Sequence, residues 1–527
     1  GMDEINPLNG LLKCSLLLKK NTFTIADYAG FIKKSADQLR KQVILLSYDD
    51  FVDFNETRDE VTLKQRLFDY TKARVGKQDY DNIRFFSLPG KAKPNAVMDV
   101  RNYNLRIAGV EKLMISESRN IFAEPSDQQV LFMKNRDMTF NGKLNAGMFD
   151  MYGQNLFFSY DKYAISLPKV DSTSMYTAGQ EKNSRGKKVQ SLIRDLTGEI
   201  VIDNPDNKSG KKEDPGFPKL NSTGESYVYF DDPVIRNGQY KRDSFYYIIK
   251  PYTLSGINDG KRFKYAFNGT LISNIVSPID DTLKLQEDNS LGLTYQTPES
   301  GIDLYGKGRL CSHIVLNKKG FVASGKVDMN KSHFQSDTIL MLPSRLLANT
   351  RELKVDEIGN RRPVAYGKDV KIQYLTADGN LQATSVSRPF DVYEGRIKHE
   401  GRLLVYEDLL DASGKLHLEG AELSSKLFHL QPVRILSQST ALNIASVLNK
   451  DIRLNTSNVT ADIDLSANKG KFANNAENNR AAFSGSRYDC TFESFTWYMK
   501  DAYLNIGIED SVQLTKIWKI ENIDQIP

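Results

Sequence analysis

Apolar and polar residues alternate along most of the chain in short segments separated by turn residues. A clear run covers residues 364–385, where Val370, Ile372 and Tyr374 occupy alternate positions. Alternation with a period of two, interrupted about every 8 to 12 residues by Gly, Asn or Asp, is typical of β-strands joined by tight turns. The pattern therefore predicts a mainly β protein built from many short strands.

Several segments contain a glycine, a basic residue and an aliphatic residue in succession. These steps are Gly142-Lys143-Leu144, Gly325-Lys326-Val327, Gly401-Arg402-Leu403 and Gly414-Lys415-Leu416, with Gly269-Thr270-Leu271 as a variant. The unequal intervals between them exclude a fixed-period solenoid of the leucine-rich or hexapeptide type. The steps indicate a degenerate repetition of one strand unit.

The clearest helical spacing lies near the N-terminus, where apolar residues predict one amphipathic helix over about 24–45. Thr24 is the expected N-cap, with Asp27 placed to complete a capping box. A second, short helix is predicted over 440–448, and 60–83 fits either a helix or a strand. The helices are therefore expected to be a minor part of the fold.

The sequence predicts an all-β fold in the form of an elongated stack of short strands, of β-solenoid or open β-jelly-roll type. The predicted parts are an N-terminal helical cap or arm (1–50), a first β-rich region (51–202), a loop or linker (203–221) and a second β-rich region (222–527). The amphipathic helix would cover strand edges that are otherwise exposed. Parallel and antiparallel pairing both remain open, and the end at Pro527 without an evident cap favours a longer parent chain.

The amino-acid composition excludes several functional classes for this protein. Among 527 residues there are 71 basic and 66 acidic ones, a net charge of +5 with the two signs interleaved, which argues against nucleic acid as a partner. No apolar run reaches the roughly 20 residues of a transmembrane helix. The cysteines (Cys14, Cys311 and Cys490) are too few and too scattered for a disulfide framework or a CxxC-type zinc site.

Motifs that would indicate catalysis or a cofactor are missing from the sequence. There is no GxSxG, Walker A or GxGxxG motif, and the five histidines do not have metal-ligand spacing. Adjacent carboxylates such as Asp280-Asp281 would point to opposite faces of a strand, and turns suit them better. The loop from Asp203 to Gly210 is rich in oxygen ligands but lacks the spacing of a calcium loop. We therefore expect no catalytic residue, cofactor or metal.

Aromatic clusters are the only candidate binding residues. Rings fall on both faces of predicted strands, so one face would be buried, and the other would pack across strands or remain available to a ligand. Exposed rings could form a platform for sugars or an apolar trough for lipid. The candidates are Phe157, Phe158, Tyr160, Tyr227, Tyr229, Tyr246, Tyr247, Trp497 and Tyr498.

Two stretches, Val130–Leu167 and Phe267–Gly308, resemble a group of large, uncharacterised, extracytoplasmic proteins of Bacteroidetes type. The segment Gly414–Leu423 is similar to the strand pattern of OstA-type lipopolysaccharide-transport proteins. That family stacks antiparallel strands into an open β-jelly roll whose apolar inside carries acyl chains. The resemblance implies an extracytoplasmic location in the periplasm, in the outer membrane or at the cell surface.

These observations lead to three functional expectations. The first is a non-enzymatic structural or binding component of a bacterial cell envelope, which guides or binds lipid or glycan along a β-groove. Its partners would be envelope lipid, glycan or other envelope proteins. The second is a polysaccharide-acting enzyme, a lyase or hydrolase on a β-helix, because a site assembled from dispersed Lys, Arg and Tyr would leave no local motif. The third is a surface adhesion module.

Overall fold

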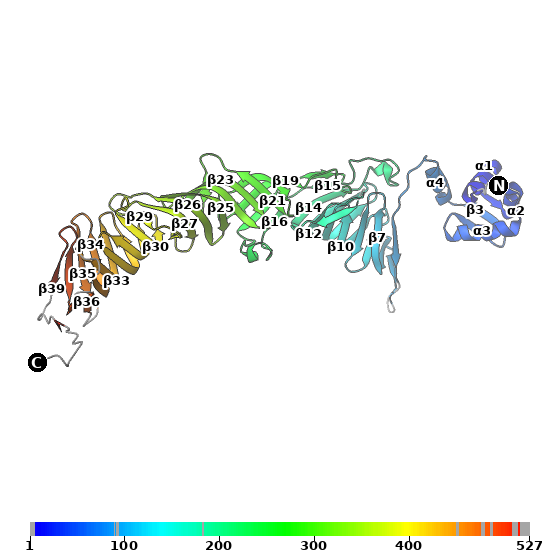
Figure 1. The fold of residues 1–527 in the computed structure, drawn as a ribbon. Helices are drawn as coiled ribbons and strands as arrows, with labels where there is room; N and C mark the ends of the chain where they lie inside the picture. Colours follow the sequence, from blue (N-terminus) through cyan, green and yellow to red (C-terminus); the bar gives the residue numbers. More distant parts are fainter. Residues whose placement is uncertain are drawn as a thin grey trace, which may run out of the picture. The chain divides into compact units, whose positions relative to one another are not determined.

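The structure, a computed structural model, describes residues 6–88, 90, 94–181, 184–448, 453–475, 480–484, 488–507 and 515–516 (Figure 1). Strands make up most of this part of the chain, which confirms the mainly β prediction. Neighbouring strands pair antiparallel, as in β10 with β11 and β30 with β31. Antiparallel pairing between successive strands settles the question that the sequence left open.

The N-terminal residues form a small helical part with its own core. Its elements are α1 (Pro7–Leu18), β1 (Thr22–Thr24), α2 (Ile25–Ile32), α3 (Ala36–Tyr48), β2 (Val52–Asn55), β3 (Glu60–Leu63) and α4 (Gln65–Arg74). The three strands form a sheet in the order β1-β3-β2. Leu11, Ile25, Val43, Val61 and Leu67 are buried together between the helices and this sheet. Within the described residues, no helix has the length and apolarity needed to cross a membrane.

The helix expected over 24–45 is in fact two helices, α2 and α3, so the prediction of one continuous helix is wrong. The predicted cap is confirmed, since Asp27 N–H donates to Thr24 Oγ1 (3.1 Å) and Thr24 N–H donates to Asp27 Oδ2 (3.0 Å). The first helix ends at Lys33, which has a φ of 58°, and Ser35 caps the second. The helical spacing continues across the break because both helices bury apolar residues in the same core.

The remaining strands belong to two compact units. The first unit runs up to Ser226 and includes Pro251–Lys264, and the second consists of Tyr227–Lys250 and the described residues from Tyr265 onward. The strands of the first unit are β4 (Arg84–Ser87), β5 (Ala96–Asp99), β6 (Asn104–Ala108), β7 (Val110–Ser116), β8 (Ile121–Pro125), β9 (Gln129–Phe132), β10 (Met138–Ala146), β11 (Phe149–Ser159), β12 (Ala164–Ala178), β13 (Arg185–Lys188), β14 (Ile193–Val201), β15 (Lys219–Ser222) and β18 (Thr253–Ser255). The predicted loop 203–221 contains a 3₁₀ turn, Pro205–Asn207, and most of β15.

The second unit continues the antiparallel pattern with longer strands, and β16 (Ser226–Tyr229) begins at the boundary. Its strands are β17 (Phe245–Ile249), β19 (Ala266–Ser273), β20 (Ile279–Leu285), β21 (Leu291–Gln296), β22 (Ile302–Leu304), β23 (Gly308–Asn317), β24 (Gly320–Met329), β25 (Ser332–Leu342), β26 (Arg345–Val355), β27 (Ala365–Leu375), β28 (Asn380–Ser385), β29 (Phe390–Val392), β30 (Ile397–Val405), β31 (Leu410–Leu418), β32 (Ala421–Leu430), β33 (Arg434–Ala445), β34 (Arg453–Asp464), β35 (Lys469–Asn474), β36 (Arg480–Ser484), β37 (Tyr488–Thr491), β38 (Ser494–Tyr498), β39 (Tyr503–Gly507) and β40 (Thr515–Lys516). The helix predicted over 440–448 is wrong, since β33 runs to Ala445 and pairs with both β32 and β34.

Long strands of the second unit bury one face along their whole length even though the alternation breaks in the middle. In β26, Ala348 and Thr350 are buried and the buried series resumes at Leu353, so that Arg351 and Glu352 both face solvent. The paired strand β25 has the same break opposite this one. A shift on both strands at one level keeps the apolar side chains on a single inner face. Its buried residues include Phe321, Ile339, Leu353, Ile372, Leu403 and Ile435.

Hydroxyl side chains replace ladder hydrogen bonds at these breaks. Ser336 Oγ donates to the carbonyl oxygen of Asn349 (2.6 Å) and accepts from the N–H of Thr338 (3.2 Å). Thr350 Oγ1 donates to the carbonyl of Gln335 (2.7 Å) and accepts from the N–H of Glu352 (3.2 Å). Because buried backbone groups need partners, these hydroxyls allow the strands to break alternation without orphaned donors or acceptors.

The Gly-basic-aliphatic steps lie inside strands, as in β10, β24, β30 and β31. Gly401 in β30 pairs with Gly414 in β31, with φ values of 136° and 127°. A Cβ on Gly401 would lie 2.2 Å from the carbonyl oxygen of Ser413. Glycine is required here because the backbone is in a region that L-residues avoid and the neighbouring strand is too close for a side chain.

Replacing Gly401 with alanine is expected to destabilise the protein by about 2 to 3 kcal/mol, since backbone strain and a clash with Ser413 act together. Gly420→Ala is the matched control, because Gly420 also has a positive φ (79°) but no atom lies within 4 Å of its added Cβ. Urea unfolding of both variants measures the difference. Equal losses of stability in the two variants would contradict the role of close strand approach.

The same tyrosine hydrogen bond occurs twice in the second unit. Tyr305 Oη donates to the carbonyl of Leu342 (2.8 Å), 37 residues ahead, and Tyr393 Oη donates to the carbonyl of Gln431 (2.7 Å), 38 residues ahead. Each tyrosine follows an Asp-aliphatic pair, has a φ of 54°, and binds the end of a hairpin that contains a proline. Burial raises the pKa of both phenols. The degenerate repetition seen in the sequence is therefore most regular in this part of the chain.

Candidate functional site

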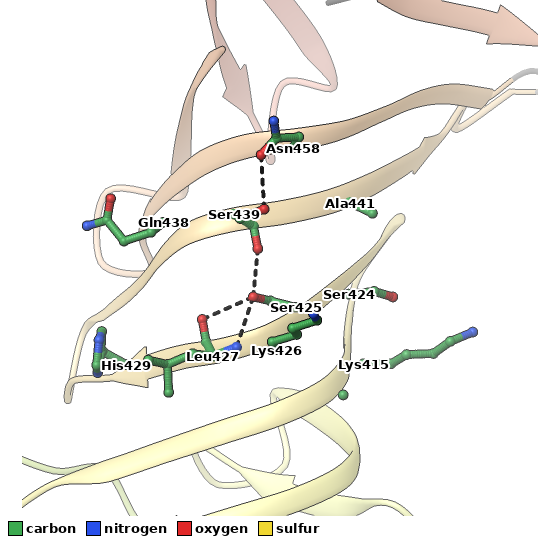
Figure 2. Close-up of a pocket in the computed structure, with 11 residues that line it drawn as sticks. Lys415, Ser424, Ser425, Lys426, Leu427, His429, Gln438, Ser439, Ala441 and Asn458 are labelled. Atoms are coloured by element: carbon green, nitrogen blue, oxygen red, sulfur yellow. Dashed lines mark hydrogen bonds between the residues drawn. The ribbon is translucent and has the colours of Figure 1, made fainter. Parts of the chain in front are cut away.

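A concave groove lies on β31–β34 of the second unit (Figure 2). Its volume is about 650 Å³, within the range of ordinary ligand sites. Most of its lining residues have polar side chains, although carbon atoms account for most of the exposed wall, and the residues come from four successive strands. The lining residues are Gly414, Lys415, Ser424, Ser425, Lys426, Leu427, His429, Gln438, Ser439, Ala441 and Asn458.

The groove forms where the strand ladder is irregular. The register of β31 against β32 shifts between Ala412 and Gly414, and β33 has shifts of its own against β34. Ser425 Oγ lies 2.7 Å from the carbonyl oxygen of Ser439 and accepts from the N–H of Leu427 (3.1 Å). Ser439 Oγ in turn donates to Asn458 Oδ1 (3.1 Å) (Figure 2). This network holds the floor of the groove in one geometry.

The charged side chains of the groove are basic. Lys415 Nζ lies 3.0 Å from a carboxylate oxygen of Glu422, and this hydrogen bond raises the pKa of Lys415. His429 Nδ1 lies 2.8 Å from Asp411 Oδ1. Glu422 and Asp411 themselves are not part of the lining. The wall therefore carries ammonium, imidazole, hydroxyl and amide groups and no carboxylate.

A smaller hollow of about 470 Å³ lies at the equivalent kind of position in the first unit. It contains Gly142, where β10 shifts register against β11 and φ is 126°. Its wall includes Asp127, Asp171 and Gln154, together with the ring of Tyr152, which is 44% exposed. In both units, therefore, a glycine that interrupts a strand adjoins a polar hollow.

Three of the predicted aromatic residues form a cluster at the start of the second unit. Tyr227 and Tyr229 of β16 stack with a ring-centroid distance of 6.1 Å, and Tyr246 of β17 lies 6.2 Å from Tyr227 and 6.1 Å from Tyr229. All three are half-buried and alternate with fully buried neighbours, which places them on the outer face. The guanidinium of Arg242 lies 4.5 Å from the Tyr229 ring centroid and pairs with Asp231. We call these three rings the tyrosine cluster.

The other predicted aromatic residues do not join this cluster. Phe158, Tyr247 and Trp497 are buried and present no ring face to solvent. Phe157 and Tyr160 are half-buried, and Tyr160 Oη donates to Asp81 (2.8 Å). Tyr498 is half-buried and stacks on Tyr503 at 4.5 Å, with Lys469 Nζ 5.0 Å from its ring centroid. The sequence predicted aromatic rings on both faces of these strands. In the structure, the rings on one face are buried and those on the other face are half-buried.

Most residues of the groove could not be predicted from local pattern, because single Ser, Lys, Gln and Asn residues have no distinctive spacing. Only Gly414 and Lys415, as part of a Gly-basic-aliphatic step, and His429, as one of the five histidines, had been considered. One sequence similarity does indicate part of the groove. Ser336-Asp337-Thr338 and Ser425-Lys426-Leu427 both begin 11 residues after a glycine, Gly325 and Gly414 respectively. These segments are the places where the alternation of buried and exposed residues is interrupted within a strand.

The histidines have separate structural surroundings. His399 is buried, with its ring nitrogens 3.0 Å and 3.2 Å from the carbonyls of Lys415 and Arg402, and burial lowers its pKa. His333 lies between Asp328 (2.6 Å) and Asp356 (2.7 Å); burial lowers its pKa, but the two carboxylates outweigh this effect and raise it overall. Among the described residues, no three His, Cys, Asp or Glu side chains are grouped to hold a metal ion.

The loop from Asp203 to Gly210 was considered as a calcium site, but its first carboxylate, that of Asp203, bonds to other side chains of the protein. Asp203 is fully buried and accepts from Arg119 Nε (2.6 Å) and Asn207 Nδ2 (3.1 Å). Asn204 caps the 3₁₀ turn by accepting from the N–H of Asp206 (3.0 Å). These oxygens anchor the loop to the body of the first unit.

The fold and its outer-face sites thus define a large antiparallel β-sheet protein with two hollows and a half-buried tyrosine cluster on its outer face. The chain matches no protein-family model, and it has no match among curated proteins or solved structures. Its function must therefore be argued from its own residues.

Proposed function

We propose that this protein is a non-enzymatic structural or binding component of a bacterial cell envelope that binds glycan on the outer face of its β-sheet. The tyrosine cluster is the observation that carries this proposal. Aromatic faces suit the apolar faces of sugar rings, and three rings that pack on one another are already held in place before a ligand arrives.

The inner face of the sheet supports glycan over lipid. Its apolar side chains are buried strand after strand, with exposures near zero for Phe321, Ile339, Leu353 and Leu403. Side chains packed in this way already fill the space that an acyl chain would occupy. The half-buried rings of the tyrosine cluster lie on the opposite, outer face, where a polyhydroxylated chain can form stacking contacts and hydrogen bonds.

The envelope location in this proposal comes from the resemblance of Val130–Leu167 and Phe267–Gly308 to extracytoplasmic proteins of Bacteroidetes type. Repetitive antiparallel sheets suit a scaffold role, because each strand adds outer surface without a new core topology. Cell fractionation with an antibody against this chain tests the location, and recovery in the cytoplasm alone would overturn it.

The binding proposal is tested by titrating the protein with neutral oligosaccharides, cellohexaose and maltohexaose, in a calorimeter. The Tyr227→Ala/Tyr229→Ala variant is expected to bind at least about tenfold more weakly than wild type, because two ring faces are lost. Tyr227→Phe/Tyr229→Phe should keep most of the affinity, since it keeps the rings.

Tyr48→Ala is the control for loss of an exposed ring elsewhere, since Tyr48 is 81% exposed on α3. Failure of the wild type to bind either sugar, or equal binding by the alanine variant, would refute the tyrosine cluster as a platform. Chromatography of the same mixtures would detect shortened sugars, and their presence would favour the polysaccharide-acting enzyme over a binding component.

A further inference from the structure

The groove on β31–β34 differs chemically from the tyrosine cluster. It has no aromatic residue and no carboxylate in its wall, and the cationic groups come from Lys415, Lys426 and His429. Figure 2 shows Gln438 and His429 toward one end and Lys415 at the other. A hollow with hydrogen-bond donors along its length and positive charge suits a ligand that is both hydroxylated and anionic.

Two polar side chains of the groove have no partner within the part of the chain that the structure describes. Lys426 is exposed and neither forms an ion pair nor donates a hydrogen bond there, and the side-chain amide of Gln438 is exposed and unbonded. In contrast, Lys415 and His429 are already paired with Glu422 and Asp411. Lys426 therefore supplies the charge that is not neutralised, and Gln438 supplies a free donor and acceptor.

The floor of the groove is built and does not need to reorganise. Ser425, Ser439 and Asn458 bond to one another or to the backbone, so their positions are fixed before any ligand binds. The bonded side chains of this floor lose little conformational entropy on binding, so the entropic cost is confined to Lys426 and Gln438. This arrangement is more typical of a binding site than of an incidental hollow in the protein surface.

We propose that this groove binds the acidic units of a glycan, with Lys426 pairing with the anionic group and Gln438 hydrogen-bonding to the sugar hydroxyls. The inference rests on the proposed function, which it deepens by naming the class of glycan. The anion is a uronate carboxylate or a sugar phosphate, two groups that share the chemistry of an oxyanion on a polyhydroxylated ring.

The test is a calorimetric titration with trigalacturonate, and with galactotriose as its neutral counterpart. Wild type is expected to bind trigalacturonate at least about tenfold more tightly, because one charge-assisted hydrogen bond is gained. Raising the ionic strength to about 0.15 M should weaken this binding, since the pair is exposed to salt. Glucose 6-phosphate and inorganic phosphate distinguish a phosphorylated sugar, or a free ion, from a uronate.

The Lys426→Ala variant is expected to lose about tenfold in affinity for trigalacturonate, and Lys426→Arg to retain it, because arginine keeps the charge. Lys371→Ala is the control, since Lys371 is also an exposed lysine and lies on β27 outside the groove. Equal affinities for the acidic and the neutral trisaccharide, or an unchanged affinity in Lys426→Ala, would overturn the inference.

The two proposals can fail separately. Binding of trigalacturonate that survives Tyr227→Ala/Tyr229→Ala but not Lys426→Ala would support the groove independently of the tyrosine cluster. Binding of neutral sugars alone would leave the proposed function standing and refute the acidic specificity. Binding of inorganic phosphate as tight as that of either acidic sugar would reduce the groove to an ion site and overturn its role in glycan recognition.

Discussion

Replacing Arg362 with alanine is expected to destabilise the second unit by about 4 to 5 kcal/mol, the largest effect of any single change considered for this protein. Arg362 is completely buried. Its guanidinium donates to the carbonyls of Asn330 (3.1 Å), Tyr406 (2.7 Å), Lys331 (3.2 Å) and Asp356 (3.1 Å). Alanine would leave these oxygens without their donor, the Asn330 carbonyl in a buried place, and it would also open a cavity.

The carbonyls that Arg362 binds belong to three separate connections between strands. Asn330 and Lys331 form the turn between β24 and β25, Asp356 follows β26, and Tyr406 follows β30. Burial lowers the pKa of Arg362, and the charges of Asp356 and Asp408 partly offset this effect. Arginine is suited to this position because its fork of five donors reaches several acceptors at once, which a lysine ammonium cannot match.

The neighbouring Arg361 provides a matched control for the Arg362 experiment. It is 66% exposed and forms a surface pair with Asp408 at 2.5 Å. Arg361→Ala is expected to cost less than about 1 kcal/mol, because solvent screens such pairs. Urea unfolding monitored by circular dichroism compares the two variants. Similar midpoints for Arg361→Ala and Arg362→Ala would show that the buried guanidinium does not hold these loops.

Replacing Asp203 with alanine is expected to destabilise the first unit by about 3 to 5 kcal/mol, since it leaves the Arg119 charge buried without its carboxylate. The side chains of Asp203 and Arg119 are 1% and 9% exposed. Arg119 Nη1 also donates to the carbonyl of Asp214 (3.0 Å), so the pair fixes both ends of the loop that follows β14. Loss of the pair should release this loop from the body of the unit.

Limited proteolysis and thermal unfolding together measure the effect of Asp203→Ala. The variant should be cleaved faster within 204–217 and should unfold at a lower temperature than wild type. Arg101→Ala is the control, because Arg101 is 87% exposed and solvent screens its pair with Asp99. Unchanged cleavage of the loop in Asp203→Ala would contradict its role as an anchor.

Much of the local structure followed from the sequence. The alternation over 364–385 corresponds to β27 and β28, and the Thr24–Asp27 capping box forms as expected. Both patterns depend on interactions between residues close in the chain. The break between α2 and α3 was missed because apolar spacing reports which residues meet the core, and a turn at Lys33 that keeps both helices on the same core does not disturb it.

The candidate sites could be predicted from local sequence pattern to a much smaller extent. The sequence identified Tyr227, Tyr229 and Tyr246 only as members of a longer aromatic series that included the buried Tyr247 and Trp497. A strand with rings on both sides does not reveal which side will face the core. That choice depends on register with neighbouring strands, because a shift of one residue would exchange the two faces.

The sequence by itself therefore determined the mainly β class, the cap of the second helix and the presence of glycines that the backbone requires, since each follows from short-range alternation, capping or steric limits. Only the tertiary structure decided that Gly401 and Gly414 face each other inside paired strands, and that residues from Gly414 to Asn458 line one groove. The physical reason is that hydrogen-bond register between strands brings together side chains that are far apart in the chain, and a register shift at one bulge can create a hollow that no single segment specifies.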